Sequence, residues 1–341
     1  MTAIKTYKIE MSLQGRLTQL PDSQKIFGAL IYMYADYYSS QKAALLVSKI
    51  REEEMYVSLS NMMPLDHLPV PQSYLLDQAA RLPKHDNAGD RLTAKQIYQA
   101  IKKRVYVKKE QLENFIVNPE HAANVFPYVH IRSGQQIHAS IDSVRFNIPG
   151  LDPNLYSVPE VTVLEKESKT GKDKHVTAFS FYLCLDDSLE SAELLDALHH
   201  AQSDSRRFFL GARASQGLNQ YMITAIRAEE WAVKDGLRTF LNMGMLLPKN
   251  INYEQSFIQL YTSERRPYEA FGKWDNNELS GQFISFIDAG SIVSVNNSWQ
   301  QAGRSISSPF PHRARDVVFG HACLFPLDIE GRSLLGITKN V

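Results

Sequence analysis

A short loop carries the residues best suited to binding a charged ligand. Arg213 lies between Gly211 and Gly217 in the stretch RRFFLGARASQGLNQYM, with Ser215 and Gln216 beside it. A guanidinium presents a planar fork of donors that matches a phosphate group, and hydroxyl and amide groups add smaller donors. Glycine lets a backbone approach a ligand closely. The loop is therefore a candidate site for a nucleic-acid backbone.

The same glycines also allow a purely structural explanation. Gly211 could cap the C-terminus of the preceding helix, and Gly217 could do no more than shape a turn. Short motifs of this kind also arise without function. The loop taken alone leaves both explanations open.

Catalytic and metal-binding motifs are not found in the sequence. It has no GxSxG, HExxH or P-loop pattern, and its two cysteines have no CxxC spacing. His199 and His200 could act as general acid and base on RNA, or could stabilise a helix C-terminus, where a cation is favoured. No second catalytic partner is evident. We therefore expect that the chain is not an enzyme and uses no metal and no cofactor.

The composition is typical of a folded protein with room for two domains. The chain has 341 residues, of which 44% are hydrophobic and 22% charged, and its formal net charge is zero. A zero net charge argues against strong nonspecific binding of polyanions but permits a local basic patch. The N-terminus lacks the apolar core of a signal peptide, and no apolar run approaches the ~20 residues that cross a bilayer. We expect a cytoplasmic protein that does not contact a membrane.

The elements that would position the loop begin with a strand and a helix. Residues 4–13 alternate between apolar and polar, which predicts a half-buried strand. Asp22 or Ser23 can then cap a helix with an apolar stripe from Ile26 onward. Lys25 falls in the first turn, where the helix dipole disfavours a cation. An anion bound at this position would therefore stabilise both the helix N-terminus and Lys25.

A basic block follows a loop-like, proline-rich stretch at 60–90. Residues 91–109 include no acidic residue, and Tyr98 and Tyr106 are interleaved with the basic ones. RNA-binding surfaces often show this mixture, although a solvated helix face can have the same composition. The block belongs to an insertion, about 81–118, that could project from the body. Its candidate RNA contacts are Lys102, Lys103, Arg104 and Lys108.

Strand-like sequence resumes after the insertion. Residues 129–148 are predicted to form a hairpin with a turn at Ser133 and Gly134, and further strands are expected at 161–166 and 176–185. Three polar side chains within the predicted hairpin are additional candidates for binding: His138, Arg145 and Asn147.

The order of elements predicts the fold class. Asp187 and Glu190 fit a capping pair for the helix that leads to the glycine loop (residues 208–219), and a strand follows. Strand, helix, insertion, strands, helix, loop and strand make up the split β-α-β order of an α+β, ferredoxin-like fold, which RNA-recognition domains share. We expect this domain to span 1–230 and a smaller, β-rich, ferredoxin-like domain to span 231–341.

Several stretches resemble one family. The chain is similar to the RAMP superfamily of CRISPR RNA-binding proteins, and more closely to the Cas5-group Csm subunit of type III-A effector complexes. The stretches that carry the resemblance are DSQKIFGALIYMY, RFNIPG, LLDALHHAQSDSRRFFLGARASQGLNQYMI and GHACLFPLDI. In the glycine loop, Phe209 precedes the first glycine and Asn219 stands where the family commonly has another. Asparagine tolerates left-handed φ, and Arg213 would carry more of the phosphate contact.

The resemblance implies a specific role in antiviral defence. Such subunits grip the 5′ handle of the CRISPR RNA (crRNA), contact the large Palm-domain subunit and the backbone RAMP subunit, and do not cut RNA. A projecting thumb kinks the duplex of guide and target RNA near the handle, and we place this thumb at 98–115, within the basic insertion. The expected handle contacts are Lys25, His138, Arg145, Asn147, Arg207, Gly211, Arg213, Ser215, Gln216, Gly217 and Asn219.

Two other functions fit the same sequence. A metal-independent endoribonuclease on this fold could process CRISPR precursor RNA through His199 or His200. A scaffold protein without RNA contact could use the glycine loop as architecture only.

Overall fold

The fold is built on an antiparallel sheet whose central strands have a ferredoxin-like order. The computed structural model describes residues 3–82, 93–140, 154–211, 213–265, 282–310 and 316–328. The first sheet runs β10-β11-β1-β9-β2, with β3 also paired to β9. Among its four main strands the order is fourth, first, third, second along the chain, as in a ferredoxin-like fold. The strands are β1 (Lys5–Leu13), β2 (Val57–Leu59), β3 (Met63–Pro64), β9 (Ala178–Leu185), β10 (Arg207–Phe209) and β11 (Gln220–Glu229).

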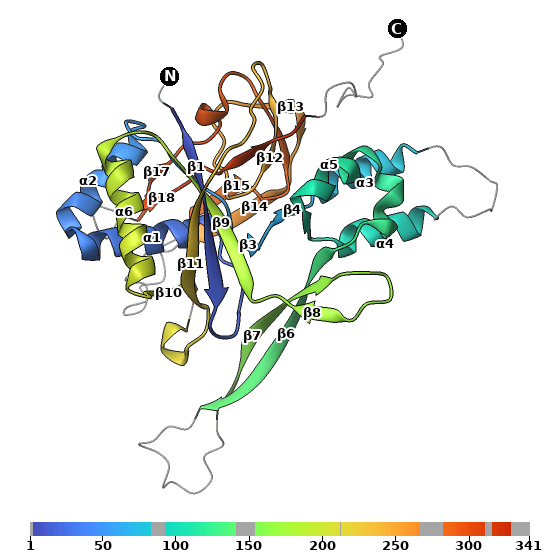
Figure 1. Cartoon of the computed structure of the whole chain (residues 1–341), viewed down its shortest axis with the longest axis horizontal. Helices are drawn as coiled ribbons and strands as arrows, with labels where there is room; N and C mark the ends of the chain where they lie inside the picture. The colour runs from blue at the N-terminus through green and yellow to red at the C-terminus, as the bar shows by residue number, and fades with distance from the viewer. Residues whose placement is uncertain are drawn as a thin grey trace, which may run out of the picture.

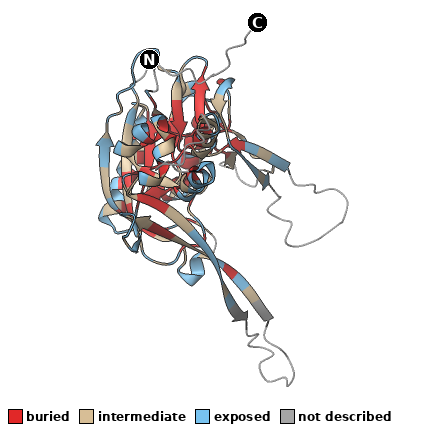
Figure 2. Ribbon diagram, turned by 90° about the vertical axis from the view of Figure 1, so that its right-hand side faces the viewer, coloured by how far each residue is buried: buried red, intermediate tan, exposed pale blue. Residues whose placement is uncertain are grey.

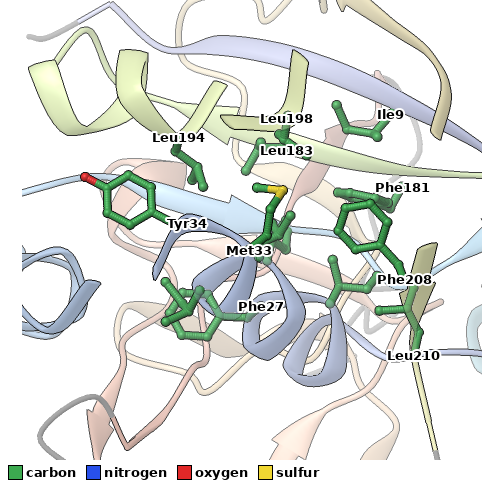
Figure 3. Packing of buried hydrophobic residues seen from close by; sticks show 14 of the residues in the cluster. Ile9, Phe27, Met33, Tyr34, Phe181, Leu183, Leu194, Leu198, Phe208 and Leu210 are labelled. Carbon is green, nitrogen blue, oxygen red and sulfur yellow. The ribbon is translucent and has the colours of Figure 1, made fainter. Parts of the chain in front are cut away.

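Three helices pack on one face of this sheet (Figure 1). They are α1 (Ser23–Tyr37), α2 (Ser40–Arg51) and α6 (Leu189–Ser203). Alternation in β1 and β9 turns residues such as Ile9 and Phe181 toward α1 and α6, where they meet Met33 and Leu198 (Figure 3). The strand at the N-terminus and the helix after Asp22 are therefore confirmed. Among the helices of the described residues, none has the length and apolarity to cross a bilayer.

The caps of these helices match the sequence analysis only in part. The Asp22 carboxylate accepts a hydrogen bond from the Lys25 backbone amide at 2.9 Å, as a cap does. In α6 the cap is Ser188, whose hydroxyl accepts from the Ser191 amide, so the predicted pair of Asp187 and Glu190 is wrong by one position.

The insertion into the first sheet is larger than predicted. It occupies the whole connection from β2 to β9 and includes residues 60–82, where we expected a loop but β3, β4 and α3 form. Prolines stand at strand ends and before α3, which is why the stretch looked loop-like. Its remaining elements are β4 (His67–Pro69), α3 (Gln72–Ala80), α4 (Ala94–Lys103), β5 (Tyr106–Lys108), α5 (Lys109–Val117), the 3-10 helix η1 (Pro119–Asn124), β6 (Tyr128–Ser140), β7 (Asn154–Lys166) and β8 (Asp173–His175).

A long hairpin projects from the insertion. Strands β6 and β7 pair from Tyr128 with Lys166 to Ser140 with Asn154, and both views show them extending away from the body (Figures 1 and 2). The turn predicted at Ser133 and Gly134 is wrong, because both residues lie inside β6 and pair with β7. Ser-Gly favours turns locally, but pairing with a strand distant in the sequence keeps this one extended.

The C-terminal half contains a second sheet with the same strand order. Read from one edge it runs β19-β12-β16-β13, so its strands also lie fourth, first, third and second along the chain. Within the described part of residues 231–328 the helical content is a single 3-10 turn, η4 (Trp299–Gln301), which agrees with the expected β-rich half. The strands of this half are β12 (Thr239–Asn242), β13 (Ile251–Phe257), β14 (Leu260–Arg265), β15 (Gln282–Ile287), β16 (Ile292–Val295), β17 (Ile306–Ser307), β18 (Val317–Val318) and β19 (Leu324–Pro326).

The two halves share buried side chains. Tyr182 and Cys184 point from β9 away from the helices and join a cluster with Leu241 and Phe325 of the second sheet. Phe319 reaches the core of the first sheet, where its ring stacks on Phe27 with centroids 4.2 Å apart. The expected boundary near residue 230 falls in the connection from β11 to β12, but the cores on either side of it are continuous.

Candidate RNA-binding surface

The glycine loop connects two paired strands, β10 and β11. Helix α6 ends at Ser203, so Gly211 does not cap it, and β10 separates the two. Arg213 (φ 65°) and Gly217 (φ 72°) both adopt the left-handed conformation, and they flank a 3-10 turn, η2 (Ala214–Gln216). Ser215 and Gln216 are exposed at the tip of this turn. The donors that the loop turns toward solvent are therefore the side chains of Ser215 and Gln216.

Asn219 fixes the loop to the segment that follows β1. Its side chain is fully buried, accepts from the Thr18 amide at 2.8 Å and donates to the Thr18 hydroxyl at 2.8 Å. Its own amide donates to the Arg16 carbonyl oxygen at 2.8 Å. The expected left-handed φ is confirmed at 55°. The expected RNA contact through the Asn219 side chain is wrong, because both ends of that amide bind Thr18.

A glycine that the sequence analysis missed makes this junction possible. A Cβ on Gly15 would lie 2.4 Å from the carbonyl oxygen of Gly217, so the two backbones meet where no side chain fits. Arg16 follows it with a side chain that is 62% exposed, 4.0 Å from Glu160 of β7. The pattern Gly-Arg directly after a predicted strand was the available signal for this second basic segment.

Arg213 also meets the projecting hairpin. Its guanidinium carbon lies 5.2 Å from the ring centre of Tyr156, a cation–π distance. Tyr156 pairs across the hairpin with His138. The backbone of His138 therefore lies close to Arg213, and both residues were predicted to contact RNA. Tyr156 was not predicted, because only the tertiary structure places it beside the loop. Arg207 lies on β10 with an exposed side chain.

Lys25 lies in a different environment from the one expected. Its ammonium group forms an ion pair with Asp22, and the amide of Ser23 donates to the Asn61 side chain at 2.8 Å. Because protein groups satisfy these donors, the start of α1 does not offer the anion site that we predicted. Lys25 instead lines a pocket shared with the C-terminal half.

Arg104 is buried in the interior of the insertion and hydrogen-bonds to its backbone. It is 3% exposed, and its guanidinium donates to the carbonyl oxygens of Ala100, Ala123 and Val125 at 2.9 to 3.1 Å. Its guanidinium carbon lies 4.3 Å from the ring centre of Tyr128, and burial lowers its pKa to about 10. The prediction that Arg104 contacts a duplex is therefore wrong in this structure.

The other basic candidates of the insertion lie closer to solvent. Lys102 and Lys103 are exposed at the end of α4, and Lys108 is half-buried and pairs with His67 across β4 and β5. Figure 1 shows two projections from the insertion: the helices α3, α4 and α5 extend to one side of the body, and the β6–β7 hairpin extends in another direction. Arg145 and Asn147 lie outside the described residues, as does the side chain of His138.

His199 and His200 lie on the solvent side of α6. Both are exposed, and the imidazole of His200 is 3.4 Å from the Asp196 carboxylate and stacks on Tyr37. Within the described residues, no cluster of three or more His, Cys, Asp or Glu side chains is arranged to hold a metal ion.

The fold consists of two ferredoxin-like sheets, and the glycine loop lies before the last strand of the first sheet. Neither a protein-family model nor a curated protein matches the sequence. The structure is similar to a chain of the Csm1-Csm4 cassette in complex with cA4, with a TM-score of 0.54 and 12% identity over 96% of this chain and 98% of that one.

Two further solved structures give the same result. A chain of the Csm3-Csm4 subcomplex in the type III-A CRISPR-Cas interference complex matches with a TM-score of 0.52 and 12% identity over 95% of this chain and 99% of that one. The Csm1-Csm4 cassette in complex with pppApA matches at 0.51, with 12% identity over 97% and 100% of the two chains. The resemblance expected from the sequence is confirmed at the level of the fold.

Proposed function

We propose that the chain is a non-catalytic RNA-binding subunit of a type III-A CRISPR effector complex and that its glycine loop holds the 5′ handle of crRNA. The observation that carries this proposal is the left-handed conformation of Arg213. Such a conformation costs an arginine roughly 1–2 kcal/mol, a cost that glycine avoids. A position that keeps arginine at this cost suggests a use for the guanidinium, and phosphate is the ligand that its fork suits.

Neighbouring groups support a backbone-binding site at this loop. Ser215 and Gln216 are exposed donors, and Arg16 adds a second largely exposed guanidinium from the segment that Asn219 fixes to the loop. Arg207 and His138 remain proposed contacts at its edges. The local charge is positive although the net charge of the chain is zero, which suits an RNA shared with other subunits.

The similar structures support a proposal for the protein partners. Those structures contain Csm1 or Csm3 together with Csm4. By analogy we propose that this chain contacts a large Palm-domain subunit and a backbone RAMP subunit. The β6–β7 hairpin, rather than the helices of the insertion, is our candidate for contact with target RNA near the handle. Lys103 lies close enough to this hairpin for its charge to act on His130 of β6.

A charge reversal at Arg213 tests the proposed handle site. Arg213→Glu in the assembled complex should weaken retention of crRNA, and the slope of log affinity against log salt should shrink by about one for the lost phosphate contact. Arg51→Glu on α2 makes the same change of charge away from the loop and should retain RNA normally. An unchanged affinity and slope for Arg213→Glu, with the fold intact, would contradict the handle site.

The same preparations separate the other two functions. Absence of RNA from every purified complex would support a scaffold. Cleavage of added precursor RNA by the chain alone, reduced on the order of a hundredfold by His199→Ala with His200→Ala, would support an endoribonuclease. We expect neither result.

A further inference from the structure

A pocket lies between the first turns of α1 and the C-terminal half. It has a volume of about 420 Å³, and its walls include Lys25, Gly28 and Tyr32 of α1 together with Tyr261, Ser263 and Phe286 of the β14–β15 ribbon. Asp316 and Ser308 add polar groups. The volume lies within the range typical of small-molecule sites.

Gly28 is unexplained by the packing of the chain itself. It lies inside α1, where glycine is a poor helix former, and a Cβ built on it meets nothing within 4 Å. No close approach within the described structure therefore requires glycine at this position. What glycine does provide is free space in the pocket wall.

Two tyrosines stand over this space from different elements. Tyr32 of α1 is 56% exposed and Tyr261 of β14 is 47% exposed, although both are large apolar side chains. Tyr261 pairs with Phe286 across the ribbon, and the buried Phe286 anchors this face of the ribbon to the body. Exposed aromatic faces beside hydroxyl groups are the usual platform for unpaired bases.

The charges in the pocket favour the base of a nucleotide over its phosphate. Asp22 and Asp316 bring carboxylates to the lining, and Lys25 is already paired with Asp22. A phosphate in the pocket would meet these carboxylates, whereas a neutral base with N–H groups can donate to a carboxylate.

The pocket is also near the glycine loop along the chain. Gly15 touches Gly217 of the loop, and Asp22 lines the pocket. The seven residues that separate Gly15 from Asp22 can span at most about 25 Å. One short stretch of single-stranded RNA can therefore reach both places.

We propose that this pocket accepts one unpaired base of the bound RNA, stacked against Tyr32 and Tyr261, in the space left by Gly28. This proposal rests on the proposed function, because the RNA is the one that the glycine loop holds. The base is neutral and enters the pocket, while its phosphates stay outside.

Chemical probing of crRNA in the assembled complex tests this assignment. In the unaltered complex one base should be protected from a reagent that modifies unpaired bases. Gly28→Leu fills the pocket and should expose that base, with a rise in reactivity on the order of tenfold, as expected for loss of stacking. Tyr32→Ala should act in the same direction, and Tyr32→Phe should keep the protection.

Two controls keep the outcome specific. Gly28→Ala should leave the thermal midpoint of the free chain unchanged or higher, which shows that α1 tolerates a side chain there. Gln41→Leu places the same leucine side chain at an exposed position of α2 and should leave the protection unchanged.

The failures of the two proposals are distinguishable. If Gly28→Leu and Tyr32→Ala leave every base as protected as before while crRNA stays bound, the pocket proposal is overturned and the handle site stands. Release of a protein subunit by Gly28→Leu, with base reactivity unchanged, would make the pocket a protein contact and also overturn it. A complex that holds no RNA at all would overturn both proposals.

Discussion

The two sheets of this molecule share one strand order but bury their faces differently. In the first sheet, α1, α2 and α6 cover one face, as the ferredoxin-like fold requires. The second sheet lacks α-helices in the described residues, and its inner face packs on β9 and on the insertion. A ferredoxin-like sheet can therefore do without its helices where a neighbouring sheet supplies the apolar cover. The second sheet depends on the first, and the rear face of the first depends on the second.

Removal of the second half should have the largest effect on the folding of the first half. A chain that ends at residue 238 leaves Tyr182 and Cys184 of β9, now 3% and 0% exposed, without their cover. We expect this fragment to lose cooperative unfolding, because exposure of such a face removes the main driving force for packing. Near-ultraviolet circular dichroism during a urea titration measures the cooperativity of unfolding. A sharp transition with native-like aromatic signals would show that the halves are independent.

Phe319→Ala tests the same dependence at one side chain. Phe319 comes from the second half, is 1% exposed and stacks on Phe27 in the core of the first. Truncation of a buried phenylalanine costs about 3–5 kcal/mol. Phe283→Ala, at a side chain that is 70% exposed, is the matched control and should change the free energy of unfolding by less than about 0.5 kcal/mol. Equal urea midpoints for the two variants would contradict a shared core.

Arg104→Leu should destabilise the insertion on which the second sheet packs. It leaves three carbonyl oxygens without the donor that they now share. A buried polar group without a partner costs about 1–3 kcal/mol, so we expect a loss of about 3 kcal/mol in urea unfolding. Lys102→Leu is the control at an exposed position on the same helix. If the two variants were equally stable, Arg104 would be free for a role at the surface.

Acid should weaken the contact between the halves. His321 is 8% exposed beside Tyr56 and Phe319, and burial lowers its pKa to about 4. The unfolded chain takes up this proton near pH 6.5, so the stability contributed by the neutral imidazole is complete above that pH and is lost as the pH falls toward 4. The loss is at most about 3 kcal/mol.

A comparison of two histidine variants checks this dependence. His321→Gln should flatten the dependence of the urea midpoint on pH between about 7 and 4, the window that the unfolded and folded pKa values define. His200→Gln, at an exposed position, should preserve the slope. An unchanged slope in the His321 variant would assign the acid sensitivity to other groups.

The sequence predicted those features that depend on local pattern. Alternation in residues 4–13 and the cap at Asp22 identified β1 and α1, and the order of elements identified the fold class. Local pattern does not reveal pairing between strands that are distant in the sequence. For this reason the turn expected at Ser133 and Gly134 proved to be part of a strand. The count of basic residues could not separate the buried Arg104 from the exposed Lys103, because charge alone does not reveal which carbonyl oxygens are near.

The site was predicted in the same uneven way. Arg213 and the glycines around it were recognised from their residue types, since left-handed turns favour glycine and asparagine. Tyr156 and Gly15 join the site only through tertiary contacts, at 5.2 Å from Arg213 and against the Gly217 carbonyl oxygen. The contact of Tyr156 leaves no local pattern in the sequence, and the Gly-Arg pair after the first strand is the one local sign of the segment that contains Gly15.

The anchoring of the glycine loop by Asn219 has a consequence for conformational entropy. Fixing the backbone of one free residue costs about 1–2 kcal/mol. Thr18 and the Arg16 carbonyl oxygen already hold Asn219, and the left-handed turns at Arg213 and Gly217 are set in the unbound chain. That ordering cost is met when the protein folds, so a ligand that docks here keeps more of its interaction energy as affinity.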